Sequence, residues 1–163
     1  STQGVSSAAS DVYKRQKPGV ANAFGVVGGD ANAIAPGKRM LSSMSPSLVT
    51  RDGKVTLVLG TPGGSRIFTS IFQVLNNLYD YHLPLEKAVA AQRVHHQLLP
   101  KDTIYYDAYA PLTGKVADEL KAMGYTLEDQ GWEMGDIQAI RVNGTALETA
   151  SDPRGRGVGK VVK

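Results

Sequence analysis

Gly60-Thr61-Pro62-Gly63-Gly64-Ser65-Arg66 is the stretch that says most about how this chain is organised. The segment before it, Lys54–Leu59, is β-branched and aliphatic and predicts a buried strand. After it, residues 67–78 place apolar side chains at helical spacing. The glycines therefore lie in a strand-to-helix turn, where backbone N–H groups and the positive end of a helix can bind an anion or a reacting oxygen. A tight connection that needs glycine only for its dihedral angles explains the turn equally well.

Two nucleotide-binding motifs also place glycines after a strand, and neither fits this turn. A phosphate-binding loop closes on Lys-Ser or Lys-Thr, whereas this turn continues as Ser65-Arg66-Ile67. A dinucleotide fingerprint needs three glycines at a fixed spacing, which Gly60, Gly63 and Gly64 do not have. The sequence therefore gives little support to a nucleotide ligand.

The composition is that of an ordinary globular domain with a core. Of the 163 residues, 42% are hydrophobic and 20% are charged. The net charge is +3 and the pI is about 9.1, but basic residues are scattered, so we expect no nucleic-acid partner. No apolar run approaches about 18 residues, so we expect no membrane span. The chain has no cysteine, which excludes disulfides, thiolate catalysis and zinc–thiolate sites.

Asp52-Gly53 is the strongest hairpin signal in the chain, because it separates two strand-like runs, Ser47–Arg51 and Lys54–Leu59. Just before the first run, Met40–Pro46 contains three serines among apolar residues. Antiparallel pairing places the start of one strand beside the end of its neighbour. We therefore expect the serine cluster and the glycine turn to share one edge of a sheet.

The rest of the chain alternates between helical and strand-like segments. Asn143-Gly144 marks a second hairpin, and the glycine-rich, basic tail from Asp152 onward is expected to fray. We expect helices over 84–92 and 112–123, the latter with Leu112, Val116, Leu120 and Met123 on its apolar face, and strands over 103–107, 125–127, 137–142 and 145–150.

Two other groups of residues are candidates for a site. His95 and His96 are adjacent, and neighbouring residues point in different directions on a strand or helix, so the pair is a poor metal chelate and core or loop hydrogen bonding is favoured. Ser42 and Ser43, taken alone, are best explained by hydrogen bonds to their own backbone at a strand start. A Ser/His/Asp triad cannot be inferred from one sequence, because the fold gathers its members.

Several stretches occur together in a characteristic order: Lys17-Pro18-Gly19-Val20, Gly28–Asn32, Lys38–Pro46, Gly60–Arg66, Arg93–Gln97, Met134–Gln138 and Ala150–Arg154. This series resembles the small, C-terminal subunit of γ-glutamyltranspeptidase. The resemblance implies an α+β fold, which is part of the αββα sandwich of an N-terminal-nucleophile hydrolase, with mostly antiparallel sheets and flanking helices. It also implies an enzyme that matures by self-cleavage, needs no cofactor or metal, and in a bacterium is periplasmic or extracellular.

The resemblance assigns roles to four residues. The backbone N–H groups of Gly63 and Gly64 would form the oxyanion hole. The hydroxyls of Ser42 and Ser43 would hold the α-carboxylate of the γ-glutamyl group. The substrate would be glutathione or a related γ-glutamyl amide, which acylates a threonine before water or an amine takes the acyl group.

The N-terminal region departs from the family pattern. Residues 1–16 are expected to be a non-native or disordered tail, in which Val5–Gln16 resembles translated adapter sequence. Residues 17–157 are expected to be the family fragment and residues 158–163 a frayed tail. Val12 and Tyr13 stand where the family has the acid that binds the substrate amino group. Thr2 lacks the sequence around the family's nucleophile and is not assigned that role. We therefore expect the nucleophile, the upstream part of the small subunit and the large subunit to be missing, and the fragment to be inactive alone.

Two alternatives remain. A β-lactam acylase of the same family would share the scaffold and take a different acyl group, but the Ser42-Ser43 pair favours a glutamyl substrate. A non-catalytic α/β module could instead bind a small anion at Gly63-Gly64. Retention of glutamate without amide turnover would identify such a module.

Overall fold

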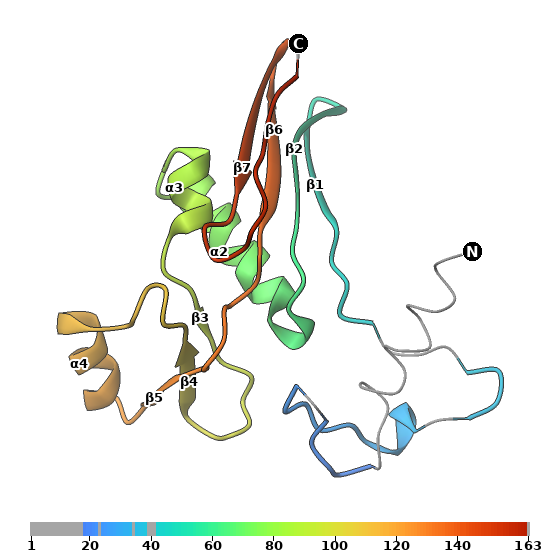
Figure 1. The fold of residues 1–163 in the computed structure, drawn as a ribbon. Helices are drawn as coiled ribbons and strands as arrows, with labels where there is room; N and C mark the ends of the chain where they lie inside the picture. Colours follow the sequence, from blue (N-terminus) through green and yellow to red (C-terminus); the bar gives the residue numbers. More distant parts are fainter. Residues whose placement is uncertain (1–17, 23, 34, 39–41, 163) are drawn as a thin grey trace. The chain divides into compact units, whose positions relative to one another are not determined.

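The computed structural model describes residues 18–22, 24–33, 35–38 and 42–162, divided into two units, residues 1–43 and 44–163 (Figure 1). The described part of the first unit is a small loop structure. An isolated bridge joins Ala21 to Val27, and one short 3-10 helix, η1 (Asp30–Asn32), follows. The tail predicted over 1–16 lies outside the described residues, so that prediction stays open.

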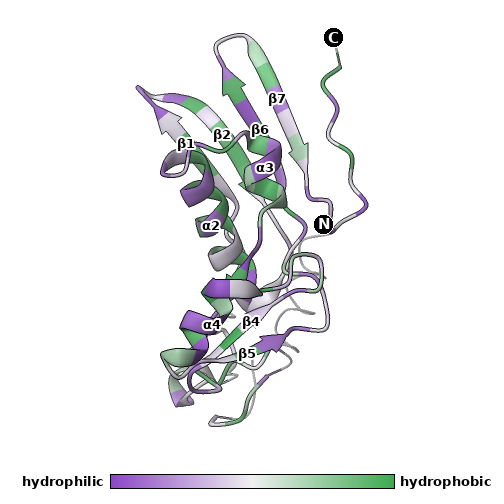
Figure 2. Cartoon of the chain, turned by 90° about the vertical axis from the view of Figure 1, so that its left-hand side faces the viewer, coloured by the Kyte–Doolittle hydropathy of each residue, from purple (hydrophilic) through white to green (hydrophobic). Residues whose placement is uncertain are grey.

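A four-stranded sheet forms the larger part of the second unit. Its strands are β1 (Ser47–Arg51), β2 (Lys54–Gly60), β6 (Gln138–Asn143) and β7 (Ala146–Ser151), in the order β1-β2-β6-β7. All three neighbouring pairs are antiparallel. The centre of β2 is hydrophobic and is drawn green in Figure 2.

Both predicted hairpins are confirmed. Asp52 and Gly53 have φ values of 51° and 73°, as a tight two-residue turn between right-twisted strands requires. Asn143 pairs with Ala146 across the second hairpin. Ser47 lies opposite Leu59, so the start of β1 does lie beside the end of β2.

Two helices cover one face of this sheet (Figure 1). α2 (Ile67–Tyr79) confirms the predicted helix, whereas α3 (Leu85–Ala90) is shorter than predicted, because Ala91 already turns into extended backbone. The core packs the inner faces of sheet and helices together. Its buried members are Leu57, Leu59, Ile67, Ile71, Val74, Leu78, Leu85, Ala88, Val89, Ile137, Ala139 and Ala150.

A second, three-stranded sheet contains β3 (Val94–His95), β4 (Thr103–Tyr106) and β5 (Thr126–Asp129). β4 and β5 are parallel and are connected through α4 (Gly114–Ala122), as a parallel pair requires a crossover. This parallel pair was not predicted from the sequence.

The predicted apolar face of the helix after Pro111 is partly wrong. Leu112 is buried, but it lies before the helix, which starts at Gly114. Leu120 packs against the small core of this sheet, whereas Val116 and Met123 are exposed, because α4 turns a different side toward β4 and β5. The observed architecture is α+β with mostly antiparallel sheets, as predicted. Within the described ranges, no helix has both the length and the apolar character needed to cross a membrane.

Candidate functional site

The glycine turn connects the end of β2 to the start of α2 through a short 3-10 helix, η2 (Gly64–Arg66). Gly63 has a φ of 141° and Gly64 a φ of 58°, which are conformations that favour glycine. Their carbonyl groups accept bonds from Arg66 N–H and Ile67 N–H. Neither glycine N–H donates a hydrogen bond to any residue that the structure describes. The predicted strand-to-helix turn is therefore confirmed, with two backbone donors at the start of a helix.

The loop before β6 packs against this turn. A Cβ atom added to Gly63 would lie 3.9 Å from Cα of Gly135. The hydroxyl of Thr61 accepts a hydrogen bond of 2.7 Å from the backbone N–H of Asp136. The turn is thus fixed against a segment that lies 75 residues away in the sequence.

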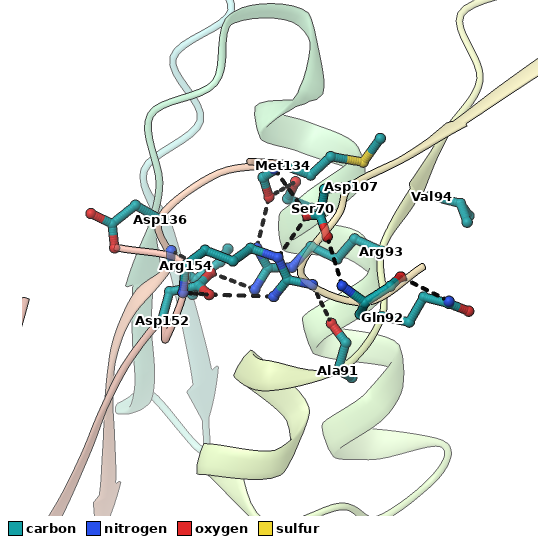
Figure 3. Close-up of polar contacts among 12 residues, drawn as sticks. Ser70, Ala91, Gln92, Arg93, Val94, Asp107, Met134, Asp136, Asp152 and Arg154 are labelled. Carbon is teal, nitrogen blue, oxygen red and sulfur yellow. Dashed lines mark hydrogen bonds and ion pairs between the residues drawn. The ribbon is translucent and has the colours of Figure 1, made fainter. Parts of the chain in front are cut away.

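Four charged side chains form a buried network behind that loop (Figure 3). Arg93 pairs with Asp152 at 2.6 Å, and Arg154 pairs with Asp107 at 2.7 Å and with Asp152 at 3.3 Å. Each of these side chains is at most 1% exposed. The expected fraying of the glycine-rich tail is therefore wrong at Asp152 and Arg154, because their ion pairs hold them in the interior. Burial lowers the pKa of Arg93, and the charge of Asp152 acts in the opposite direction.

The network also holds the backbone of the loop before β6. Met134 N–H donates to the Asp107 carboxylate at 3.0 Å, and Arg93 donates to the Met134 carbonyl at 2.7 Å. Ile137 N–H donates to Asp152 at 2.9 Å. The loop is therefore fixed at both ends. In the sequence, Arg93, Met134, Asp152 and Arg154 belong to stretches of the family resemblance, and Asp107 ends a predicted strand. Their contacts were not predicted, because no local pattern links positions so far apart.

Arg66, the last residue of the turn, occupies a different environment. It is 4% exposed and donates to the side-chain oxygen of Gln130 at 2.5 Å. Its guanidinium carbon lies 4.7 Å from the ring centre of Trp132 and 5.9 Å from that of Tyr105. No carboxylate among the described residues forms an ion pair with it. Burial lowers the pKa of Arg66.

The two histidines have separate surroundings, as expected for an adjacent pair. His95 is buried, with Nδ1 3.0 Å from the Thr69 hydroxyl and Nε2 3.1 Å from the Gln97 side chain. Burial lowers the pKa of His95. The ring of His96 instead meets Tyr125 edge-on. In the part of the chain that the structure describes, no three His, Asp or Glu side chains gather in a group able to hold a metal ion.

Ser42 and Ser43 belong to the first unit, whereas Gly63 and Gly64 belong to the second. Ser42 is exposed and Ser43 is half-buried. Each unit is described on its own, so the expected carboxylate-binding role of the serine pair stays a prediction.

Comparisons with known proteins cover nearly the whole chain. A family model described as Gamma-glutamyltranspeptidase matches residues 8–162. The glutathione hydrolase proenzyme of Pseudomonas aeruginosa is 91% identical over 147 residues, which make up 90% of this chain and 26% of that protein. The Escherichia coli glutathione hydrolase proenzyme is 48% identical over 85% of this chain and 23% of its own length. The chain therefore spans about a quarter of the length of these relatives.

Solved structures give the same result. The γ-glutamyltranspeptidase from Pseudomonas nitroreducens complexed with L-DON is 92% identical, with a TM-score of 0.89 over 91% of this chain and 77% of that chain. An acivicin-inhibited γ-glutamyltranspeptidase is 44% identical, with a TM-score of 0.80 over 86% of this chain and 75% of that chain. The cephalosporin acylase from Bacillus halodurans is 24% identical, with a TM-score of 0.66 over 75% of this chain and 23% of that chain, which shows similarity of fold alone.

Proposed function

Because this chain belongs to the γ-glutamyltranspeptidase family, as its motifs predicted, we propose that the full-length protein hydrolyses glutathione and related γ-glutamyl amides and transfers their γ-glutamyl group. One observation carries the proposal furthest. Gly63 and Gly64 present two adjacent backbone N–H groups at a strand-to-helix turn, and neither donates to another described residue. Such a pair can stabilise the negative oxygen that develops during acyl transfer.

The proposed reaction has two steps. A threonine hydroxyl attacks the γ-carbonyl carbon, and the carbonyl oxygen becomes an oxyanion that accepts hydrogen bonds from the N–H groups of Gly63 and Gly64. Collapse of this intermediate expels the amine and leaves an acyl-enzyme. Water or an acceptor amine then attacks the ester, which releases glutamate or a new γ-glutamyl amide. No threonine among these 163 residues is assigned as the nucleophile.

The other parts of the site follow from the family resemblance. We propose that Ser42 and Ser43 hold the α-carboxylate of the γ-glutamyl group, within a family segment that spans residues 17–157. We also propose that the four-stranded sheet is one layer of an αββα sandwich. The apolar side chains exposed on this sheet, Leu48, Val58 and Ile140, support a second layer against it. By the same resemblance the protein is periplasmic or extracellular.

A β-lactam acyl substrate is the second candidate. The cephalosporin acylase from Bacillus halodurans is similar in fold, but this likeness carries no substrate preference at 24% identity. The paired hydroxyls of Ser42 and Ser43 suit a carboxylate, which favours the glutamyl group. Assay of the full-length protein with both substrate classes separates the two candidates.

The test compares Gly63→Ala with the double change Ser42→Ala and Ser43→Ala in the full-length protein. Gly63→Ala keeps the N–H group but disfavours the φ of 141° that aims it at the oxyanion. We expect a kcat lower by about 10²–10³ with little change in KM, because the oxyanion exists only in the transition state. The serine changes should mainly raise KM, since the carboxylate is bound in both states. Release of a chromogenic amine from a γ-glutamyl anilide measures both constants.

Gly144→Ala is the matched control. Gly144 also has a positive φ, 62°, but lies in the β6–β7 hairpin with no atom within 4 Å of an added Cβ. The Gly144→Ala variant therefore shows how much a positive-φ glycine changed to alanine lowers kcat through backbone strain alone. Equal kcat values for the Gly63 and Gly144 variants would contradict the oxyanion role.

A further inference from the structure

The hydroxyl of Thr61 lies between two backbone groups at the base of the glycine turn. Its Oγ1 donates to the carbonyl oxygen of Pro62 at 2.7 Å and accepts from the N–H of Asp136 at 2.7 Å. The first distance is typical of an O–H···O bond, and the second is at the short end of the range for an N–H···O bond. We call this pair of hydrogen bonds the Thr61 bridge. It connects the turn to the loop before β6.

The acceptor of this bridge belongs to the same peptide group as one of the proposed oxyanion donors. The carbonyl of Pro62 and the N–H of Gly63 lie in one planar peptide unit, and this peptide is trans. In a trans peptide the C=O and N–H bonds point in opposite directions. A hydrogen bond that fixes the Pro62 oxygen therefore also fixes the direction of the Gly63 N–H.

The bridge has an electronic consequence as well. Hydrogen bonds arranged in a chain polarise one another, so a peptide whose oxygen accepts a bond is a stronger donor through its nitrogen. Here the chain runs from Asp136 N–H to the Thr61 hydroxyl, then to the Pro62 carbonyl, and through that peptide to Gly63 N–H.

We propose that Thr61 is a positioning residue for acyl transfer, which aims and strengthens the Gly63 N–H at the oxyanion. This proposal rests on the oxyanion role given to Gly63 under the proposed function. Thr61 contacts no reacting atom and acts only through the Pro62–Gly63 peptide, whose carbonyl oxygen it binds.

The neighbouring loop leaves the bridge little freedom. Gly135 has a φ of 86°, and a Cβ added there would lie 2.6 Å from Oγ1 of Thr61. The backbone of that loop is held in turn by the bonds of Met134 to Arg93 and Asp107. The Thr61 hydroxyl is thus confined by the backbone at Gly135, as a positioning group needs to be.

The test uses Thr61→Val and Thr61→Ser in the full-length protein. Thr61→Val keeps the shape and removes the hydroxyl. We expect about a tenfold lower kcat with KM changed less than about twofold, because the affected contact forms only in the transition state. Thr61→Ser retains the hydroxyl and should recover kcat to within about threefold of the wild type. Gly135→Ala, which displaces the same hydroxyl, should also lower kcat.

Thr56→Val is the matched control. Thr56 is half-buried on β2, and its hydroxyl donates to the Val49 carbonyl at 3.2 Å, away from the glycine turn. This variant should keep the wild-type kcat. A fall in kcat for Thr61→Val that Thr61→Ser does not recover, or that Thr56→Val reproduces, would overturn the proposal.

Gly63→Ala separates the two levels of inference. If Gly63→Ala loses kcat but Thr61→Val does not, the role of Thr61 is wrong and the oxyanion assignment stands. If Gly63→Ala keeps the wild-type kcat, the oxyanion assignment fails, and the role of Thr61 fails with it. A lower kcat in both Gly63→Ala and Thr61→Val, with recovery of kcat in Thr61→Ser, supports the oxyanion role of Gly63 and the positioning role of Thr61.

Discussion

Arg93 and Arg66 lie in the same unit and are buried to nearly the same extent, with exposed fractions of 1% and 4%. Their surroundings are nevertheless opposite. Arg93 meets a carboxylate at 2.6 Å and belongs to a network of alternating charges (Figure 3). Arg66 meets two aromatic rings and a glutamine, and pairs with no carboxylate among the described residues.

The difference indicates different tasks for the two arginines. Removing charges from water costs several kcal/mol per ion, and an ion pair recovers that cost only with good geometry and further hydrogen bonds. The Arg93 network meets this condition and fixes three loops at once, around Asp107, Met134 and Asp152. The charge of Arg66 instead faces two aromatic rings and one amide oxygen, which compensate for its burial less than a paired carboxylate does.

Asp152→Asn should have the largest effect on stability. The change keeps the shape but removes the carboxylate that pairs with Arg93 and leaves Arg154 paired with Asp107. Breaking such a buried pair costs about 3–5 kcal/mol. Urea unfolding of the full-length protein measures the decrease in the free energy of unfolding. Asp118→Asn, on the exposed side of α4, is the control and should stay within about 0.5 kcal/mol. If Asp152→Asn changed the free energy of unfolding as little as Asp118→Asn, the network would not be a source of stability.

Arg66→Met should have a smaller effect, within about 1 kcal/mol in either direction. The change removes a buried charge and its desolvation cost, and it also removes the contacts with Trp132 and Gln130, so the two consequences offset each other. The same unfolding measurement applies, with Arg93→Met as the comparison, for which a loss of several kcal/mol is expected. Equal decreases in the free energy of unfolding for Arg66→Met and Arg93→Met would show that the two arginines do not differ in their contribution to stability.

The pH dependence contributed by His95 should be the smallest effect. Its pKa is lowered by burial, and the positive charges of Arg66 and His96 act in the same direction. The unfolded chain then binds a proton near pH 6.5 while the folded chain does not, so stability is lost as the pH falls below about 6.5. The slope from one group is at most about 1.4 kcal/mol per pH unit.

Unfolding free energies at pH 7.5 and 5.5 measure this dependence. His95→Gln should reduce the loss between the two pH values relative to the wild type. His82→Asn, at an exposed position, should leave it unchanged. A larger loss in His95→Gln than in the wild type would reverse the assigned direction.

Local features of the fold were predictable from the sequence. The Asp52-Gly53 and Asn143-Gly144 turns and the glycine-rich connection to α2 are specified by neighbouring residues, and the structure has all three. The apolar spacing also predicted α4, but not which side of it is buried. Val116 and Met123 match the helical period and are exposed, because tertiary packing chose a different face.

The surroundings of the site were not predictable in the same way. Arg154 and Asp107 are 47 residues apart, and Arg66 and Gln130 are 64 apart, so only the fold brings each pair together. Thr61 gave no signal of its own beyond its place in the glycine turn. The identities of Gly63 and Gly64 were informative because their positive φ values restrict the choice of residue.

The pairing of β2 with β6 has a consequence for the timing of folding. Gly60 pairs with Gln138, so the strand that leads into the glycine turn waits for a partner made about 80 residues later. During synthesis on the ribosome, the β1–β2 hairpin can form early, but the loop that holds Thr61 does not yet exist. The two backbone donors therefore reach their final arrangement only after Asp136 and the strands beyond it have been synthesised. The donor arrangement that we propose for acyl transfer is thereby complete only once this part of the chain has folded.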